Sequence, residues 1–299
     1  MLKLVNELAI SHNELRGVSH MKIALYNETK VGVVKDDKIY DVTDIVSWDA
    51  DHPQDSLLTF MKSYKTNKEL IEEKLTENLA QNLSEVKLNA PVPNPGKIVA
   101  APVNYYLHQD EMNEQFNNAE YTIEKLGFFL KAPSSIIGPE DTIKLPFKDR
   151  RTDHEAELAF IVDKQAKDVP ASEAHKYIFG YFGLLDITVR GKEDRPWRKS
   201  FDTFTPIGPW IVTADELDTP NEVDLNLWVN EEKRQEANTR DLIYDCYKFL
   251  EAASAVMTLE PGDILTTGTP QGVGPITAGD KVTLQIERVG EFKVSVDYK

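Results

Sequence analysis

The sequence predicts an α+β protein that is rich in β-strands, with a small β-rich unit ahead of a larger domain. Short runs of β-branched and aromatic residues, bounded by turn residues, recur along most of the 299 residues, as is typical of strands. Few segments have apolar residues at helical spacing. The proline-rich stretch 89–96 divides the chain, because proline fixes φ and removes a backbone donor. We therefore expect a small N-terminal domain over 21–90 and a larger domain over 91–299.

Composition excludes several classes of protein. A formal net charge of -16 argues against nucleic acid or an anionic membrane as a partner, because both attract basic surfaces. No apolar run is long enough for a membrane span. Residues 1–20 form an extension that lacks a signal-peptide core and could be disordered. The single cysteine, Cys246, rules out an intrachain disulfide and indicates a reducing, cytoplasmic location.

Local patterns predict the elements of both domains. The segments 21–26, 31–34 and 38–42 read as short paired strands, and 56–83 has helical spacing. Beyond the proline-rich stretch the expected strands are 97–101, 153–162, 180–187, 207–213, 223–229, 281–286 and 292–296. The expected helices are 105–116, 171–177 and 242–259, the last with Cys246 as a buried thiol. The polar stretch 113–127 could serve as a lid.

Two glutamates on the strand 153–162 are the central feature of the sequence. Glu155 and Glu157 share one face, because side chains in a strand alternate with period two. Adjacent carboxylates repel each other unless they share a proton or bind a divalent ion. We favour the metal ion, with Asp186 as a third oxygen ligand; a solvated face of an acidic protein is the alternative. His154 lies on the opposite face by the same alternation.

A histidine and a cluster of cations supply further candidates. His108 and Glu111 are three residues apart on a predicted helix, so the carboxylate can orient the imidazole as a base for water. A surface ion pair is the alternative. Cations cluster between 190 and 199, among them Arg190, Arg195, Arg198 and Lys199. They suggest an anion-binding surface, or else partners for neighbouring acids.

The segment 267–274, here called the glycine loop, reads T-G-T-P-Q-G-V-G. Its glycines allow the backbone to approach a ligand, and Thr267 and Thr269 offer hydroxyls. Neither a phosphate loop nor a dinucleotide fingerprint is present, because the glycine spacing fits neither motif.

Taken together, these motifs resemble the fumarylacetoacetate hydrolase family over roughly residues 90–296. The matching motifs are N-Y-x-x-H-x-x-E-M at 104–112, F-F-L-K at 128–131, E-x-E at 155–157, G-Y-x-x-x-x-D at 180–186, K-S-F-D-T-F at 199–204, G-P-W at 208–210, L-E-P-G-D at 259–263 and the glycine loop. Their joint order and spacing are far more specific than any one of them.

The resemblance implies a mixed β-sandwich roll, a pseudobarrel, that forms the catalytic domain of a homodimer. It implies one Mg²⁺ or Mn²⁺ per subunit, with Ca²⁺ as a substitute, held by Glu155, Glu157 and Asp186. The substrate would be a small anionic oxo acid, either an acylpyruvate or a 1,3-diketo acid. The metal would stabilise the enolate that forms when a carbon–carbon bond is hydrolysed.

The resemblance also implies residue roles. His108, oriented by Glu111, would activate water, and Lys199 would neutralise oxyanion charge. Substrate contacts would come from Lys131, Arg190 and Thr269.

Three positions, Pro102, Gly191 and Glu193, depart from the family pattern and bear on specificity. We expect the charge of Glu193 to disfavour a second substrate carboxylate unless Arg195 or Arg198 offsets it.

Two alternatives follow from the same residues. A 2-oxo acid decarboxylase of the oxaloacetate type, an isomerase or a dehydratase would use the same metal and enolate chemistry. A non-catalytic, metal-binding acidic protein would need neither His108 nor Lys199.

Overall fold

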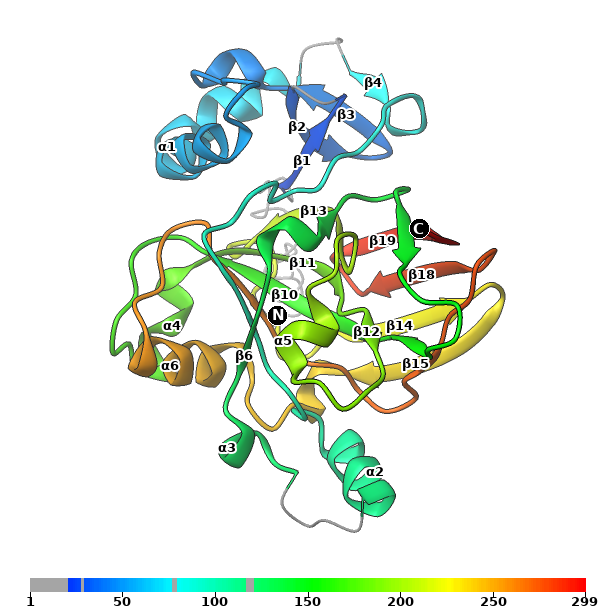
Figure 1. Ribbon diagram of the computed structural model, residues 1–299. Helices are drawn as coiled ribbons and strands as arrows, with labels where there is room; N and C mark the ends of the chain where they lie inside the picture. The colour runs from blue at the N-terminus through cyan, green and yellow to red at the C-terminus, as the bar shows by residue number, and fades with distance from the viewer. Residues whose placement is uncertain (1–20, 28–29, 77–79, 117–120) are drawn as a thin grey trace, which may run out of the picture.

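The computed structural model describes residues 21–27, 30–76, 80–116 and 121–299 (Figure 1). The predicted extension over 1–20 and part of the predicted lid lie outside these residues. Within them, the strands form sheets of eleven, five and three strands. None of the described helices is long and apolar enough to cross a membrane. The predicted α+β class, with several sheets and few helices, is confirmed.

The largest sheet joins the N-terminal strands to the rest of the chain. Its order is β4-β3-β2-β1-β13-β11-β10-β16-β5-β6, with β7 paired to β13. Its strands are β1 Lys22–Tyr26, β2 Lys30–Lys35, β3 Lys38–Asp41, β4 Gln81–Asn82, β5 Ile98–Ala100, β6 Phe129–Lys131, β7 Ile136–Ile137, β10 Ala156–Val162, β11 Ile178–Leu185, β13 Thr205–Thr213 and β16 Ile264–Thr266. The pairing of β1 with β13, Lys22 opposite Val212, makes the N-terminal unit continuous with this sheet. The division into domains at 90 stays a prediction.

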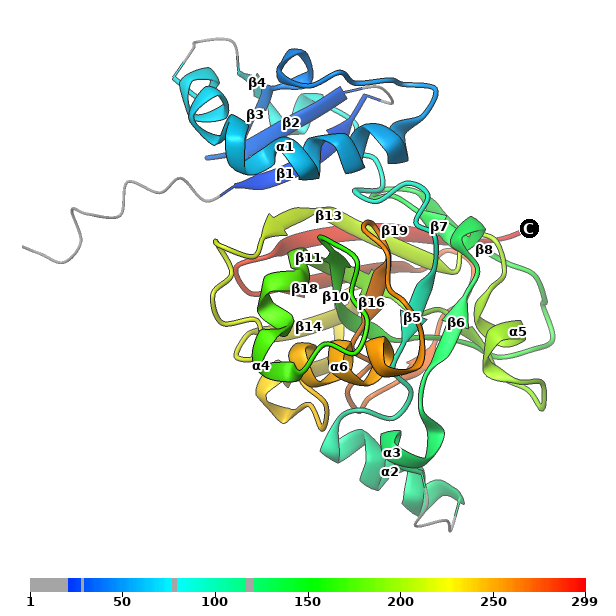
Figure 2. The ribbon, with the colours of Figure 1, turned by 90° about the vertical axis from the view of Figure 1, so that its left-hand side faces the viewer.

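Two smaller sheets complete the β structure (Figure 2). The five-stranded sheet has the order β15-β14-β18-β19-β8, with β8 Thr142–Leu145, β14 Asp224–Val229, β15 Glu232–Asn238, β18 Lys281–Ile286 and β19 Gly290–Tyr298. The three-stranded sheet has the order β12-β9-β17, with β9 Thr152–His154, β12 Thr188–Val189 and β17 Gly274–Pro275.

Strands β10 and β11 are buried along their whole length, because apolar cores lie on both faces. Leu158 and Phe160 belong to one core, together with Leu284 of the five-stranded sheet. The alternate residue Ile161 belongs to the other core, together with Phe60 of α1. A strand that is buried on both faces reads as a continuous apolar run, so the acids at its start stand out.

The helices lie on the outside of the sheets, and all except the 22-residue α1 are short. They are α1 Pro53–Lys74, α2 Tyr106–Phe116, α3 Ile123–Leu126, α4 Ala171–Ala174, α5 Arg195–Lys199 and α6 Cys246–Val256, with 3-10 turns η1 Thr43–Ile45, η2 Leu83–Glu85, η3 Pro133–Ser135, η4 His175–Tyr177 and η5 Thr239–Asp241. The helix predicted over 56–83 is wrong at its end, because 81–82 pair with β3 instead. Helices α2 and α3 lie at the opposite end of the molecule from α1 (Figure 1).

Candidate metal centre

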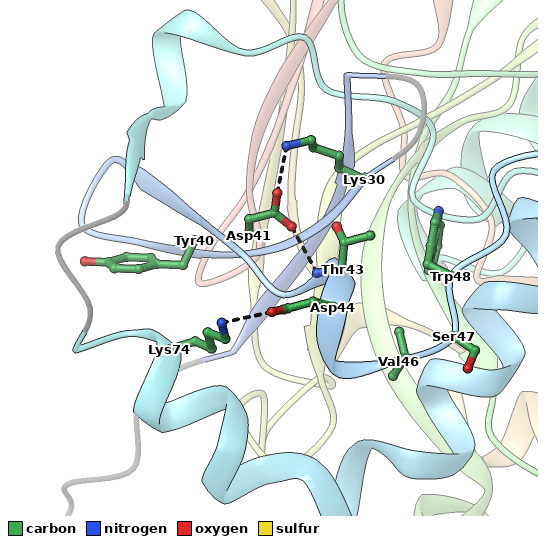
Figure 3. A pocket seen from close by; sticks show the side chains of 9 residues that line it. All are labelled: Lys30, Tyr40, Asp41, Thr43, Asp44, Val46, Ser47, Trp48 and Lys74. Atoms are coloured by element: carbon green, nitrogen blue, oxygen red, sulfur yellow. Dashed lines mark hydrogen bonds and ion pairs between the residues drawn. The ribbon is translucent and has the colours of Figure 1, made fainter.

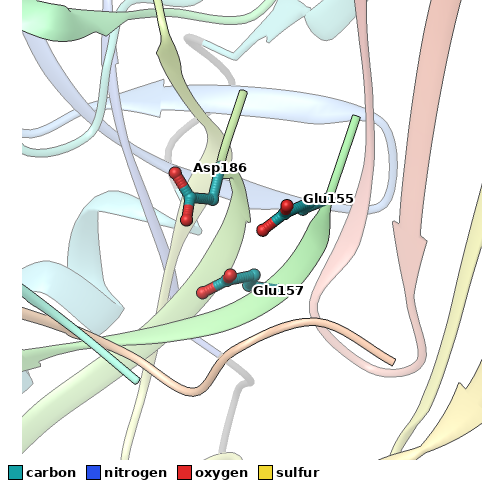
Figure 4. Close-up of side chains that lie close together, drawn as sticks. All are labelled: Glu155, Glu157 and Asp186. Carbon is teal, nitrogen blue, oxygen red and sulfur yellow. The ribbon is translucent and has the colours of Figure 1, made fainter. Parts of the chain in front are cut away.

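The three predicted metal ligands lie together at the start of β10. Glu155 lies between β9 and β10, Glu157 lies in β10, and Asp186 follows β11. The amide of Asp186 donates to the carbonyl of Glu155 at 2.8 Å, which joins the two strand ends. One oxygen from each acid lies within 4.8 Å of the others, and all three residues are buried. Their carboxylates gather in one place (Figure 4).

Two lysines and one arginine compensate part of this buried negative charge. Lys199 Nζ donates to Glu155 at 2.7 Å and to Asp186 at 2.6 Å. Lys131, whose side chain is fully buried, donates to Asp186 and to the carbonyl of Phe204. Arg190 Nη2 donates to Glu155 at 3.1 Å. The alternative that the cations near 190–199 pair with neighbouring acids therefore applies to Arg190 and Lys199.

The carboxylates differ sharply in their tendency to ionise. Burial alone would raise the pKa of Glu155, but the charges of Lys199 and Arg190 outweigh it and lower that pKa to about 2. Burial and the charge of Asp186 raise the pKa of Glu157 to about 8. The Glu157 carboxylate accepts hydrogen bonds from Thr266 Oγ1 and from the amide of Gly268. Among the described residues, no lysine donates a hydrogen bond to it.

The residues therefore fit a divalent cation. Lys199 already places a positive charge between two of the acids, whereas Glu157 forms no ion pair with any cation in the described part of the chain. A further positive charge would therefore stabilise the ionised form of Glu157. Three carboxylates supply the hard oxygen ligands that Mg²⁺, Mn²⁺ and Ca²⁺ prefer.

The pKa of Glu157 predicts how metal binding depends on pH. In the metal-free protein Glu157 holds a proton below about pH 8, and a metal ion must displace that proton. The apparent affinity for Mn²⁺ should rise by about tenfold per pH unit from pH 6 towards pH 8 and then level off. Because the folded-state pKa is raised, the metal-free protein should lose stability as pH rises through the same window. Calorimetric titration with Mn²⁺ from pH 6 to 9 measures this, and a flat affinity would contradict it.

His108 and Glu111 form the predicted pair on α2. His108 Nδ1 lies 2.9 Å from Glu111 Oε2, and His108 is buried. The hydrogen bond from His108 lowers the pKa of Glu111, to which the backbone amide of Gly272 also contributes. An ionised carboxylate can only accept, so Nδ1 carries the hydrogen and Nε2 is left as a base. When His108 takes up a proton, its charge acts on Glu155, which brings the pair into the electrostatic range of the acids.

The remaining predicted residues, Arg190 and Thr269, have other surroundings. Arg190 Nε donates to the buried Asp153 at 2.6 Å, and Thr269 is buried in the glycine loop. The structure thus places Arg190 and Lys131 against protein carboxylates, and their contact with substrate stays a prediction. His154 is buried with Nδ1 at 3.2 Å from Gln235 Oε1 and is absent from the acid cluster.

Several supporting residues gave no sequence signal. Thr188 Oγ1 accepts from Lys199 at 2.7 Å and donates to Glu155 at 3.2 Å. Thr266 holds Glu157, and Asp153 holds Arg190. None of them belongs to a motif with a recognisable spacing, because the sheet register brings each to its partner. The predicted buried thiol of Cys246 lies in α6, where burial raises its pKa.

A cavity of about 700 Å³ lies elsewhere, in the N-terminal unit (Figure 3). Two ion pairs line it, Lys30 with Asp41 at 2.8 Å and Lys74 with Asp44 at 3.0 Å. None of its nine lining residues is a predicted site residue, so it is separate from the metal centre.

Comparison with known proteins identifies the family. Residues 97–297 match the family model described as fumarylacetoacetate (FAA) hydrolase C-terminal. A maleylpyruvate hydrolase from Aquipseudomonas alcaligenes is 42% identical over 284 residues, which cover 92% of this chain and 99% of that protein.

Two solved structures extend the comparison. Maleylpyruvate hydrolase from Sphingobium sp. SYK-6 in complex with manganese (II) ion and pyruvate is 40% identical, with a TM-score of 0.83 and coverage of 93% of this chain and 99% of that chain. The 5-carboxymethyl-2-hydroxymuconate delta-isomerase from Mycobacterium smegmatis is 30% identical, with a TM-score of 0.70 and the same coverage. The match of sequence and fold confirms the predicted resemblance, and the chain belongs to the fumarylacetoacetate hydrolase family of enzymes.

Proposed function

We propose that the chain is a divalent-metal-dependent hydrolase that cleaves a carbon–carbon bond in acylpyruvates, with maleylpyruvate as the first substrate to test. The observation that carries this proposal is the buried cluster of Glu155, Glu157 and Asp186 beside the His108–Glu111 pair. The chain is also 42% identical over nearly its whole length to a maleylpyruvate hydrolase. A homodimer and a cytoplasmic location are part of the same proposal.

The three acids would hold Mn²⁺ or Mg²⁺, with Ca²⁺ as a substitute. When bound, the ion would act as a Lewis acid on the oxo-acid oxygens and spread the negative charge that develops during cleavage. Lys199 donates its three N–H groups to Glu155, Asp186 and Thr188, so it would act on a substrate oxygen that gains charge through its positive charge rather than through a hydrogen bond. Arg190 and Lys131 would keep the acids in place and favour an anionic substrate.

His108 would act as the general base. Glu111 accepts the Nδ1 hydrogen, so Nε2 can take a proton from water. The oxygen of that water forms a bond to the acyl carbonyl carbon, and the bond between this carbon and the methylene carbon of pyruvate breaks. The electron pair of the broken bond leaves with the pyruvate fragment, which then takes up a proton. The products are pyruvate and a carboxylic acid.

The charge of Glu193 is compensated by a cation, so we do not expect it to disfavour a substrate with two carboxylates. Arg150 donates to both of its carboxylate oxygens, at 3.1 and 2.8 Å, and this hydrogen bonding lowers the pKa of Glu193. Arg150 is therefore the main offsetting cation, and the charge of Arg198, which the sequence suggested, also lowers the pKa of Glu193. Arg198 donates instead to the backbone carbonyl of Glu193 at 2.7 Å.

The direct test is an assay of metal-stripped protein with and without Mn²⁺, Mg²⁺ or Ca²⁺. The substrates are maleylpyruvate, a monoacidic acylpyruvate and oxaloacetate, and the products are separated by chromatography. We expect metal-dependent release of pyruvate from the acylpyruvates, with the diacid accepted at least as well as the monoacid because Glu193 is neutralised. Cleavage that is unaffected by chelation, or no cleavage at all, would contradict the proposal.

An isomerase or tautomerase is the second candidate, because a relative with the same coverage is named a delta-isomerase. The same product analysis separates the reactions. An isomerase changes the substrate without releasing pyruvate, and a decarboxylase of the oxaloacetate type releases CO₂.

A further inference from the structure

The side chain of Gln235 in β15 is buried, and its amide group is fully hydrogen-bonded. Oε1 accepts from the amide of Ala156 at 3.0 Å and lies 3.2 Å from His154 Nδ1. Nε2 donates to Thr269 Oγ1 at 2.8 Å and to the carbonyl of Pro270 at 2.9 Å. This one amide therefore links β10, the strand that carries Glu157, to the glycine loop.

Backbone partners fix which way the amide faces. The amide of Ala156 can only donate and the carbonyl of Pro270 can only accept, so the oxygen of Gln235 must face β10 and its nitrogen the loop. Thr269 Oγ1 therefore accepts a hydrogen bond from Gln235, and its own hydrogen must go to another acceptor. Within the described part of the chain, the Thr269 hydroxyl makes no second hydrogen bond.

The glycine loop touches both halves of the candidate metal centre. The amide of Gly268 donates to Glu157 at 3.0 Å, and the amide of Gly272 contributes to the low pKa of Glu111. Gly272 has a φ of +89°, and a Cβ there would lie 2.3 Å from the carbonyl oxygen of Arg234. The loop is thus packed tightly against β15, and Gln235 holds its middle.

We propose that Gln235 is a positioning residue that holds the glycine loop in place and commits the Thr269 hydroxyl to donate a hydrogen bond to the anionic oxo-acid substrate. This inference rests on the proposed function, since Thr269 needs a substrate oxygen as its acceptor. It explains why the buried Thr269 hydroxyl keeps one hydrogen that no described residue accepts.

The test begins with Gln235→Met, which keeps the length of the side chain and removes its hydrogen bonds. We expect KM for the acylpyruvate to rise by about ten- to hundredfold, as loss of a hydrogen bond to a charged group predicts, with a smaller change in kcat. Thr269→Val should raise KM by a similar factor. The double variant should be no worse than either single variant, because both substitutions abolish the same hydrogen bond between Thr269 and the substrate. Gln165→Met, at an exposed glutamine bound to Glu260, is the control and should match the wild type.

Hydrogen exchange in the metal-free protein supplies a readout independent of activity. Amides of the glycine loop should exchange faster in Gln235→Met than in the wild type, and Thr269→Val should change them little. Additive effects on KM, or unchanged KM and exchange in Gln235→Met, would overturn the proposal. If Gln235→Met does not fold, Gln235→Glu takes its place. It keeps the acceptor for Ala156 but cannot donate to Thr269, so the same rise in KM is expected.

Failure of the proposed function would be visible separately. If the wild type cleaves no acylpyruvate, that function is wrong, and the role of Gln235 is judged on binding of pyruvate to the Mn²⁺-loaded protein by calorimetry. Weaker binding by both Gln235→Met and Thr269→Val, together with faster loop exchange in the former, would support the positioning role. Wild-type binding by Gln235→Met would overturn it.

Discussion

Replacing His108 with alanine should lower kcat by about 10²- to 10⁴-fold, the usual contribution of a general base, and leave the affinity for Mn²⁺ almost unchanged. His108 makes its hydrogen bond to Glu111 and none of the three acids depends on it as a partner. Steady-state kinetics and a calorimetric Mn²⁺ titration on the same preparation measure both quantities.

The chain contains a matched control for this variant. His52 pairs with Asp49 at the same three-residue spacing and the same 2.9 Å distance, but on the exposed surface of the N-terminal unit. His52→Ala should keep wild-type kinetics. Loss of turnover and of Mn²⁺ binding together in His108→Ala would instead favour the non-catalytic metal-binding alternative.

Replacing Asp186 with asparagine should abolish detectable Mn²⁺ binding and turnover, and should also destabilise the protein. Asparagine has the same size but no charge, so buried Lys131 loses its carboxylate partner and Lys199 loses one of two. Removing one partner of a buried ion pair costs about 3–5 kcal/mol. Urea unfolding of the metal-free protein and Mn²⁺ titration under folded conditions are the measurements.

Asp263→Asn separates the two effects. Asp263 is equally buried and pairs with Lys97, at a position outside the acid cluster. This variant should lose stability yet bind Mn²⁺ as the wild type does. Wild-type Mn²⁺ affinity in Asp186→Asn would contradict the assignment of Asp186 as a ligand.

Sequence patterns predicted those helices and strands that are determined by the composition of the segment itself. Alternation and β-branched composition predict the three N-terminal strands and also β10, which carries Glu157. The helix over 56–83 was extended too far, because pairing of 81–82 with β3 decides that segment and no local signal encodes it. The strand over 153–162 is interrupted at Glu155, where the chain changes from one sheet to another.

The supporting contacts of the site could not be predicted for the same reason. Gln235 reaches Thr269 only because β15 pairs with β14 in a register that contains an irregularity between Leu227 and Trp228. A shift of one residue would point Gln235 to the other face of its sheet. The acids were accessible to sequence reasoning because like charges at strand spacing are conspicuous in a buried strand, whereas a single glutamine is not.

Through the pairing of β1 with β13, the N-terminal unit covers one edge of a strand that belongs to the matched family region, 97–297. A fragment lacking the N-terminal strands would expose this edge of β13 at Ile211 and Val212, along a nine-residue strand that is buried throughout. Exposed strand edges of this kind can form hydrogen bonds with strands of other molecules. We therefore expect the N-terminal unit to shield this edge from pairing with other molecules, a task that requires no contact with substrate.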